Sequence, residues 1–120
     1  MASTFRDYPY MLHLDCHLPD WLEDGLINFN AKAWAENFQT AGFNLVCVFA
    51  KCHFGNSFYN TEIGHKHAGL PQDFLRETAA ECRNRNIRTL AYYSLCCDKR
   101  AWDANPCWRW RDAEGNEGWE

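Results

Sequence analysis

The stretch Asn44–Tyr59, NLVCVFAKCHFGNSFY, contains an unbroken apolar run that stops at Ala50 and is followed at once by Lys51, Cys52 and His53. An apolar run of about four to eight residues that is bounded by polar groups is typical of a strand buried on both faces. The polar cluster therefore lies at the C-terminal end of the strand. Parallel α/β proteins bind their ligands at this edge, because the loops that leave the strands there do not have to pack in the core. The alternative is a strand end whose Lys and His merely face solvent.

Residues just beyond this cluster favour a binding site. Gly55 allows a sharp backbone turn, and Phe58 and Tyr59 supply flat surfaces of the kind that sugars and other half-apolar ligands stack against. Cys52 is a weak candidate nucleophile, because neighbours along an extended strand end point to opposite sides and Cys52 therefore cannot easily pair with His53.

The composition describes one ordinary domain with enough apolar material for a core: 120 residues, 47% hydrophobic and 16% aromatic. The net charge is −4 and the basic residues are scattered, which gives no electrostatic footprint for nucleic acid or an anionic membrane. No apolar run approaches the roughly 20 residues that a membrane span needs, and the N-terminus lacks the apolar segment of a secretion signal. We expect a cytoplasmic protein that binds small or neutral ligands.

The seven cysteines are odd in number and irregularly spaced, so we expect reduced thiols. The adjacent pair Cys96 and Cys97 does not have the spacing of a zinc site. We therefore expect no cofactor and no structural metal.

A second β-type run, Tyr10–Leu14, leads into a pattern of alternating polar residues, His13, Asp15 and His17. If the strand continues, period-two geometry places these three side chains on one side. They are then either metal ligands or substrate contacts, since alternate His and Asp side chains can converge on one point. The remaining alternative is a core histidine at position 13 followed by a polar loop.

Helical patterns alternate with the strands. Asn30 is a strong N-cap and begins a helix over Asn30–Ala41, with Phe29 placed to form a hydrophobic staple with Trp34. Gly42 is the expected stop of this helix. The pattern of a second helix covers Pro71–Arg85, which Pro71 opens and Asn86 ends in place of a terminal glycine, and a third strand covers Ile87–Ser94.

This order, strand, helix, strand, helix, strand, predicts a parallel sheet in which the strands lie in sequence order and both helices cover one face. The segment between the central strand and the second helix reads as a polar loop in which His65 and His67 are exposed. Residues 95–120 hold four of the six tryptophans but no periodicity, so we expect an irregular, Trp-rich loop that lines a site or is pinned by its own rings.

The sequence resembles the hypothetical glycosyl hydrolase 6 family and, more distantly, the α-L-fucosidases. The resemblance is carried by HLDCHLPDW at 13–21, FNAKAWAENFQTAGFNLVCVFAKCHFGNSFYNTEIGHKH at 29–67, LPQDFL at 70–75 and AYYS at 91–94. It covers most of the chain and implies that residues 1–120 form a single partial domain, the N-terminal βαβαβ portion of a (β/α)₈ (TIM) barrel.

The resemblance also implies which residues bind sugar. Fucosidases carry a Lys-His-His-Asp-Gly-Phe motif at the second strand, where this chain has Lys-Cys-His-Phe-Gly-Asn, so fucose specificity is not carried over. His13 and the Tyr-Tyr-Ser segment that contains Tyr92 and Tyr93 also match the family. The predicted contacts with a carbohydrate substrate are His13, Asp15, Lys51, His53, Tyr92 and Tyr93.

The catalytic carboxylates are expected beyond residue 120, because the fucosidase nucleophile follows a fourth strand. The carboxylates near the expected ligand edge are not marked as acid or nucleophile, and these are Asp15, Glu62, Asp73 and Asp98. We therefore expect a glycoside hydrolase segment that is inactive alone and whose open strand edges favour self-association. The alternatives are a metal-dependent, amidohydrolase-like enzyme that uses His13, Asp15 and His17 as ligands, and a non-catalytic carbohydrate-binding module.

Overall fold

A computed structural model describes residues 5–118. It contains helices and strands in the following order: η1 (Phe5–Asp7), β1 (Met11–His13), α1 (Ala31–Thr40), β2 (Leu45–Lys51), β3 (Asn56–Ser57), β4 (His65–Lys66), α2 (Phe74–Arg83), β5 (Arg88–Tyr93), α3 (Lys99–Ala104), η2 (Pro106–Trp108), β6 (Trp110–Arg111) and β7 (Glu117–Gly118). None of the helices in this part of the chain is long and apolar enough to cross a membrane.

The centre of the fold is β2, which pairs in parallel with β1 on one side and with β5 on the other. The predicted parallel pairing of these three strands and their order are therefore confirmed. The sheet as a whole is mostly parallel, because the short β3 pairs antiparallel with β2. Cys47 lies opposite His13 in β1 and Leu90 in β5, and Phe49 lies opposite Tyr92. Because side chains alternate along a strand, these five residues share one face of the sheet. His13, Phe49 and Tyr92, which lie toward the carboxyl ends of their strands, are thus brought to the same edge of the sheet.

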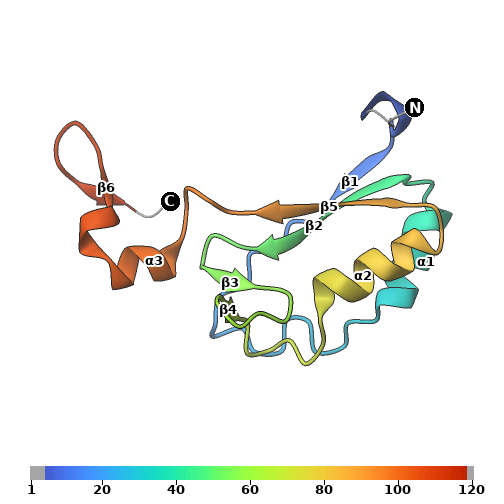
Figure 1. Cartoon of the computed structure of the whole chain (residues 1–120), viewed down its shortest axis with the longest axis horizontal. Helices are drawn as coiled ribbons and strands as arrows, with labels where there is room; N and C mark the ends of the chain where they lie inside the picture. Colours follow the sequence, from blue (N-terminus) through green and yellow to red (C-terminus); the bar gives the residue numbers. More distant parts are fainter. Residues whose placement is uncertain (1–4, 119–120) are drawn as a thin grey trace.

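The other face of the sheet is covered by α1 and α2, which lie side by side on it (Figure 1). Their amphipathic patterns place Ala35 and Phe38 of α1, and Phe74 and Cys82 of α2, against Val48 of the central strand in one buried core. The helix layer therefore leaves the face with His13 and Tyr92 open.

The ends of α1 form as the sequence predicts. The side chain of Asn30 accepts a hydrogen bond from the N–H of Ala33, and the ring centroids of Phe29 and Trp34 lie 5.3 Å apart as a hydrophobic staple. Gly42 adopts a φ of 82° after the helix, a conformation that glycine reaches without strain.

The end of α2 is also as expected, but its start is not. Asn86 adopts a φ of 57° in place of a terminal glycine. The predicted opening at Pro71 is wrong, because Asp73 caps the helix instead by accepting a hydrogen bond from the N–H of Arg76, and the first helical residue is Phe74. A carboxylate cap provides the hydrogen bond that the proline could not, so it decides the boundary.

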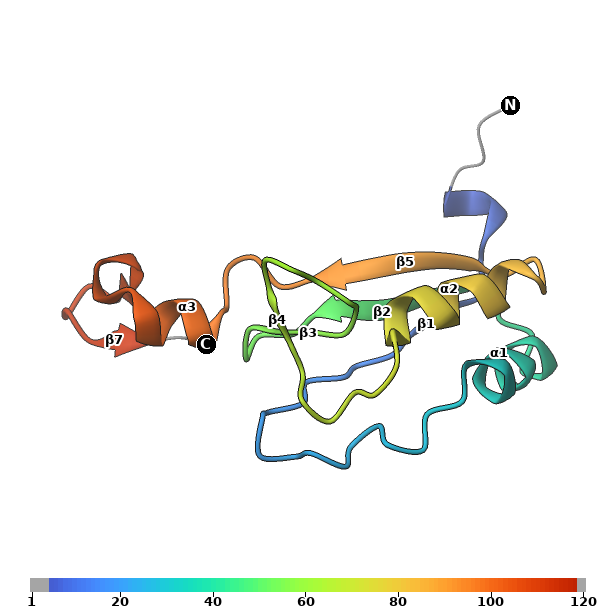
Figure 2. The same cartoon turned by 60° about the horizontal axis from the view of Figure 1, so that its bottom comes forward.

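The Trp-rich segment is folded, so the prediction of an irregular loop is wrong. It contains α3, η2 and a two-stranded hairpin of β6 and β7, which project beyond the carboxyl ends of β2 and β5 (Figures 1 and 2). The side chain of Asp98 caps α3 by accepting from the N–H of Ala101. The two final residues of the segment, 119 and 120, lie outside the described residues.

Candidate functional site

A layer of aromatic and imidazole rings covers the open face of the sheet at the carboxyl ends of its strands. Phe49 stacks on Tyr92 with ring centroids 4.3 Å apart, and His13 packs against both rings at 5.6 and 5.8 Å. Phe49 is buried beneath these contacts, whereas His13 is exposed. The three parallel strands each contribute one ring, so the layer exists only because β1, β2 and β5 are neighbours.

Two histidines extend this layer. The ring of His17 stacks on that of His53 with centroids 3.8 Å apart and meets Phe49 edge-on at 4.8 Å. Its Nδ1 accepts a hydrogen bond from the backbone N–H of His53 at 3.4 Å, so the ring proton of neutral His17 is on Nε2. That nitrogen faces Asp15 Oδ1 at 3.3 Å. We call the rings of His13, His17, Phe49, His53 and Tyr92 the imidazole wall.

Lys51 lies beside the imidazole wall and is held on three sides. Its ammonium binds the carboxylate of Asp98, donates to the backbone oxygen of Ser94 at 3.2 Å and lies 5.0 Å from the ring centroid of Tyr93. Partial burial acts to raise the pKa of Asp98, but the hydrogen bonds from Lys51 and the N–H of Ala101 outweigh it and hold the pKa below its ordinary value. The carboxylate is therefore ionised at neutral pH.

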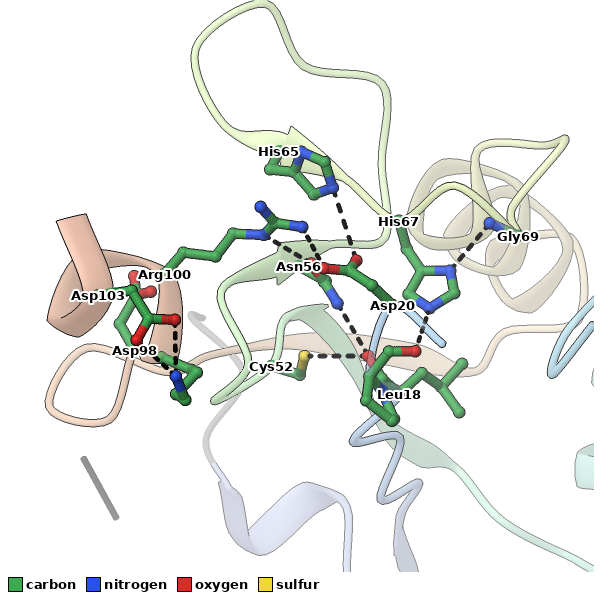
Figure 3. A network of polar contacts seen from close by, with 12 residues as sticks. Leu18, Asp20, Cys52, Asn56, His65, His67, Gly69, Asp98, Arg100 and Asp103 are labelled. Atoms are coloured by element: carbon green, nitrogen blue, oxygen red, sulfur yellow. Dashed lines mark hydrogen bonds and ion pairs between the residues drawn. The ribbon is translucent and has the colours of Figure 1, made fainter. Parts of the chain in front are cut away.

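Further contacts join α3 to the loop that follows β2. The N–H of Lys99 donates to the backbone oxygen of His53 at 2.8 Å. Arg100 donates to Asn56 Oδ1 at 3.0 Å and also binds the carboxylate of Asp20 (Figure 3). The Trp-rich segment is thus fixed against the site by both backbone and side-chain contacts.

The loop after β2 has no room for a side chain at position 55. Gly55 adopts a φ of 87°, and a Cβ there would lie 2.5 Å from Oδ1 of Asp98 and 2.9 Å from Cβ of Arg100. The sharp turn predicted for Gly55 is confirmed, and its second cause is this close approach of α3.

His67 lies behind the loop and is buried, so its predicted exposure is wrong; His65 is exposed as expected. Nδ1 of His67 accepts from the N–H of Gly69 at 3.1 Å, which leaves Nε2 to donate to the backbone oxygen of Pro19 at 3.0 Å (Figure 3). Because both ring nitrogens are bound to backbone groups, His67 fastens the loop after β1.

The thiols near the site are poor nucleophiles. Burial, helped by the neighbouring Asp15 and Cys52, raises the pKa of Cys16 to about 11. Cys52 is completely buried, with its sulfur 3.9 Å from the backbone oxygen of Leu18. All seven cysteines are free thiols.

Metal binding by His13, Asp15 and His17 receives no support from the geometry. Among residues 5–118 no group of three or more His, Cys, Asp or Glu side chains could hold a metal ion. The rings of His13 and His17 both pack on Phe49 and Tyr92, and the ring of His17 also stacks on His53.

A family model described as hypothetical glycosyl hydrolase 6 matches residues 30–118. The chain belongs to the hypothetical glycosyl hydrolase 6 family. The match includes the second and third parallel strands, both long helices and the Trp-rich segment.

Members of the α-L-fucosidases are similar to this glycosyl hydrolase 6 chain. Tissue alpha-L-fucosidase of Rattus norvegicus is 35% identical over 71 residues, which are 56% of this chain and 15% of the relative. Alpha-L-fucosidase isoenzyme 2 from Paenibacillus thiaminolyticus has a TM-score of 0.83 at 29% identity, over 92% of this chain and 17% of that chain. For Thermotoga maritima alpha-fucosidase the TM-score is 0.60 at 25% identity, over 68% of this chain and 20% of that chain. The chain thus spans 15 to 20% of the length of these relatives.

The structure brings most of the sequence-predicted contacts of this glycosyl hydrolase 6 chain to one edge. His13, His53 and Tyr92 belong to the imidazole wall, and Lys51 and Tyr93 lie beside it. Their role in sugar binding stays a prediction.

Sequence reasoning missed one member of the arrangement, Phe49, and the packing of another, His17. The sequence marks Phe49 only as part of a buried strand, and its position opposite Tyr92 depends on strand register. The sequence offers His17 as a metal ligand, a substrate contact or a loop residue, but no local pattern indicates its stack on His53.

Proposed function

We propose that this chain is the N-terminal βαβαβ segment of a glycoside hydrolase barrel and that its imidazole wall binds the sugar. The observation that carries the proposal is the imidazole wall itself, at the carboxyl ends of three adjacent parallel strands. Flat rings suit the apolar face of a pyranose, and ring nitrogens can exchange hydrogen bonds with its hydroxyl groups. In barrel enzymes this edge is where substrates bind. The similarity to α-L-fucosidases supports the same class of substrate.

The catalytic carboxylates, in this proposal, come from beyond residue 120. Hydrolysis of a glycoside needs an acid and a nucleophile or base, with carboxyl groups about 5 to 9 Å apart. Asp98 is engaged by Lys51 and by the N–H of Ala101, and Asp73 is engaged as the cap of α2. Neither carboxylate is free to attack a sugar, and in this proposal the segment supplies binding groups rather than the reacting pair.

The test is to assay the full-length protein against aryl glycosides that include α-L-fucosides and β-D-galactosides. Replacement His13→Ala removes an exposed ring of the imidazole wall and should lower kcat/KM by about tenfold, the worth of one good hydrogen bond. His65→Ala, which changes an exposed histidine outside the wall, is the matched control and should retain activity.

Two results would contradict the proposal. One is equal activity of His13→Ala and the wild-type protein on every glycoside that is hydrolysed. The other is turnover by residues 1–120 alone that is abolished by Asp15→Asn or Asp98→Asn, which would place the reacting carboxylates inside this chain.

A further inference from the structure

A second aromatic site lies next to the imidazole wall, in the Trp-rich segment. A cavity of about 150 Å³ is lined by Trp102, Trp108 and Trp110, with Asp98 at its side. Trp108 is 70% exposed and Trp110 46% exposed, so two of the rings present much of their surface to solvent. Large rings that stay exposed around a concavity are typical of a binding site.

The segment holds Trp110 in place. Gly118 lies directly across the hairpin, and a Cβ there would fall 2.1 Å from the indole of Trp110. Glu117 receives hydrogen bonds from Arg109 at 2.9 Å and from Arg111 at 2.6 Å, which joins the two strands of the hairpin. The indole therefore packs on backbone that has no side chain, and its orientation is fixed before any ligand arrives.

Trp102 is fixed in a different way. The guanidinium of Arg109 lies 3.9 Å from its ring centroid and the ammonium of Lys99 lies 5.0 Å from it. Arg109 also donates to the backbone oxygen of Trp102 at 3.0 Å. These contacts join α3 to the hairpin, so the cavity between them has defined walls.

The cavity and the imidazole wall share a boundary. Asp98 lines the cavity, and the same carboxylate binds Lys51, whose ammonium lies 5.0 Å from the ring centroid of Tyr93. An ionised carboxylate is an acceptor for hydroxyl groups, and the indole rings offer apolar faces. A ligand long enough to lie on the imidazole wall and continue past Lys51 would reach these groups.

We propose that the cavity lined by Trp102, Trp108, Trp110 and Asp98 binds a second pyranose ring, so that the substrate is an oligosaccharide or glycoconjugate rather than a simple monosaccharide glycoside. The occupant is a sugar because the lining combines flat apolar rings with a hydroxyl acceptor. This inference rests on the proposed function, since it assigns the first ring to the imidazole wall.

The test is a titration of the full-length protein, by calorimetry, with L-fucose and D-galactose and with a disaccharide in which L-fucose is joined to D-galactose through sulfur, a linkage that glycoside hydrolases do not readily cleave. The disaccharide should bind about tenfold more tightly than either monosaccharide, as expected for one added stacking contact. Trp110→Ala should remove this preference and leave the monosaccharide affinity unchanged, with at most a small fall in melting temperature from the lost packing of the indole on Gly118. Trp21→Ala, which changes an 81% exposed tryptophan that does not line the cavity, is the control and should keep the preference.

The outcomes separate the two proposals. If a monosaccharide binds but the disaccharide shows no preference, or Trp110→Ala keeps the preference, the second site is refuted and the proposed function stands. A fall in melting temperature with the preference intact also refutes it, because the ring then serves only packing. Binding of the disaccharide alone, lost in Trp110→Ala, supports the second site and contradicts the imidazole wall. No binding of any of these sugars overturns both.

Discussion

The ion pair between Lys51 and Asp98 allows a test of how the Trp-rich segment is attached. The two side chains are only 12% and 20% exposed, and Asp98 also caps α3. Asp98→Asn removes the charge and keeps a side chain that caps helices well. Asp98→Ala removes both contributions, so the pair of variants separates them.

The expected cost follows from the contacts. Asp98→Asn keeps one oxygen for the N–H of Ala101 and turns an amide NH₂ toward the ammonium of Lys51. The largely buried ammonium then loses its charge-assisted hydrogen bond and keeps the one to the backbone oxygen of Ser94, so we expect a loss of about 2 kcal/mol in the free energy of unfolding. Asp98→Ala should lose about 1 kcal/mol more, the worth of an N-cap. Lys51→Met should recover part of the loss caused by Asp98→Asn, because no buried charge then lacks its partner.

Urea unfolding of the full chain measures these values. The folded-state pKa of Asp98 lies below its ordinary value of 3.8, so the stabilisation by its charge is present above that pH and is lost as the pH falls through the lowered pKa. The difference between the wild-type protein and Asp98→Asn should therefore be constant near neutrality and shrink below pH 3.8. Equal stability of the two proteins at pH 7, or strictly additive costs of Lys51→Met and Asp98→Asn, would refute the reasoning.

Three other features give predictions. Gly55→Ala should lower the free energy of unfolding by about 3 kcal/mol in thermal or urea unfolding, because the new Cβ meets the ion-paired Asp98. The control Gly42→Ala, at a φ of 82° with nothing within 4 Å, should cost only about 1 kcal/mol of backbone strain. Equal costs of the two substitutions would contradict the close approach of α3 to Gly55. His67→Leu should cost about 2 kcal/mol, since two buried backbone groups lose their partner, and unchanged unfolding would exclude this role. With iodoacetamide at pH 8, mass spectrometry should find exposed Cys96 alkylated well before Cys16, whose pKa is raised to about 11, and the reverse order would count against its burial.

The sequence alone determines the parts of this protein that depend on short-range patterns. The apolar run of β2, the Asn30 cap and the positive φ of Asn86 follow from residues within a few positions of each other. Strand, helix and turn preferences are set locally, and alternation of strands with helices leaves a parallel sheet as the simple solution. The shared edge of His13 and His53 follows from this order.

Only the tertiary structure decides the features that join distant segments. His67 is buried because Pro19, far away in sequence, offers a backbone oxygen to its ring. The stack of His17 on His53 and the bond between Lys51 and Asp98 likewise join residues more than thirty positions apart. Local propensity carries no information about such pairs, because their energy comes from burial and hydrogen bonds that exist only after the chain has folded. The imidazole wall and the Trp-lined cavity are therefore properties of the fold, although each of their residues can be read from the sequence.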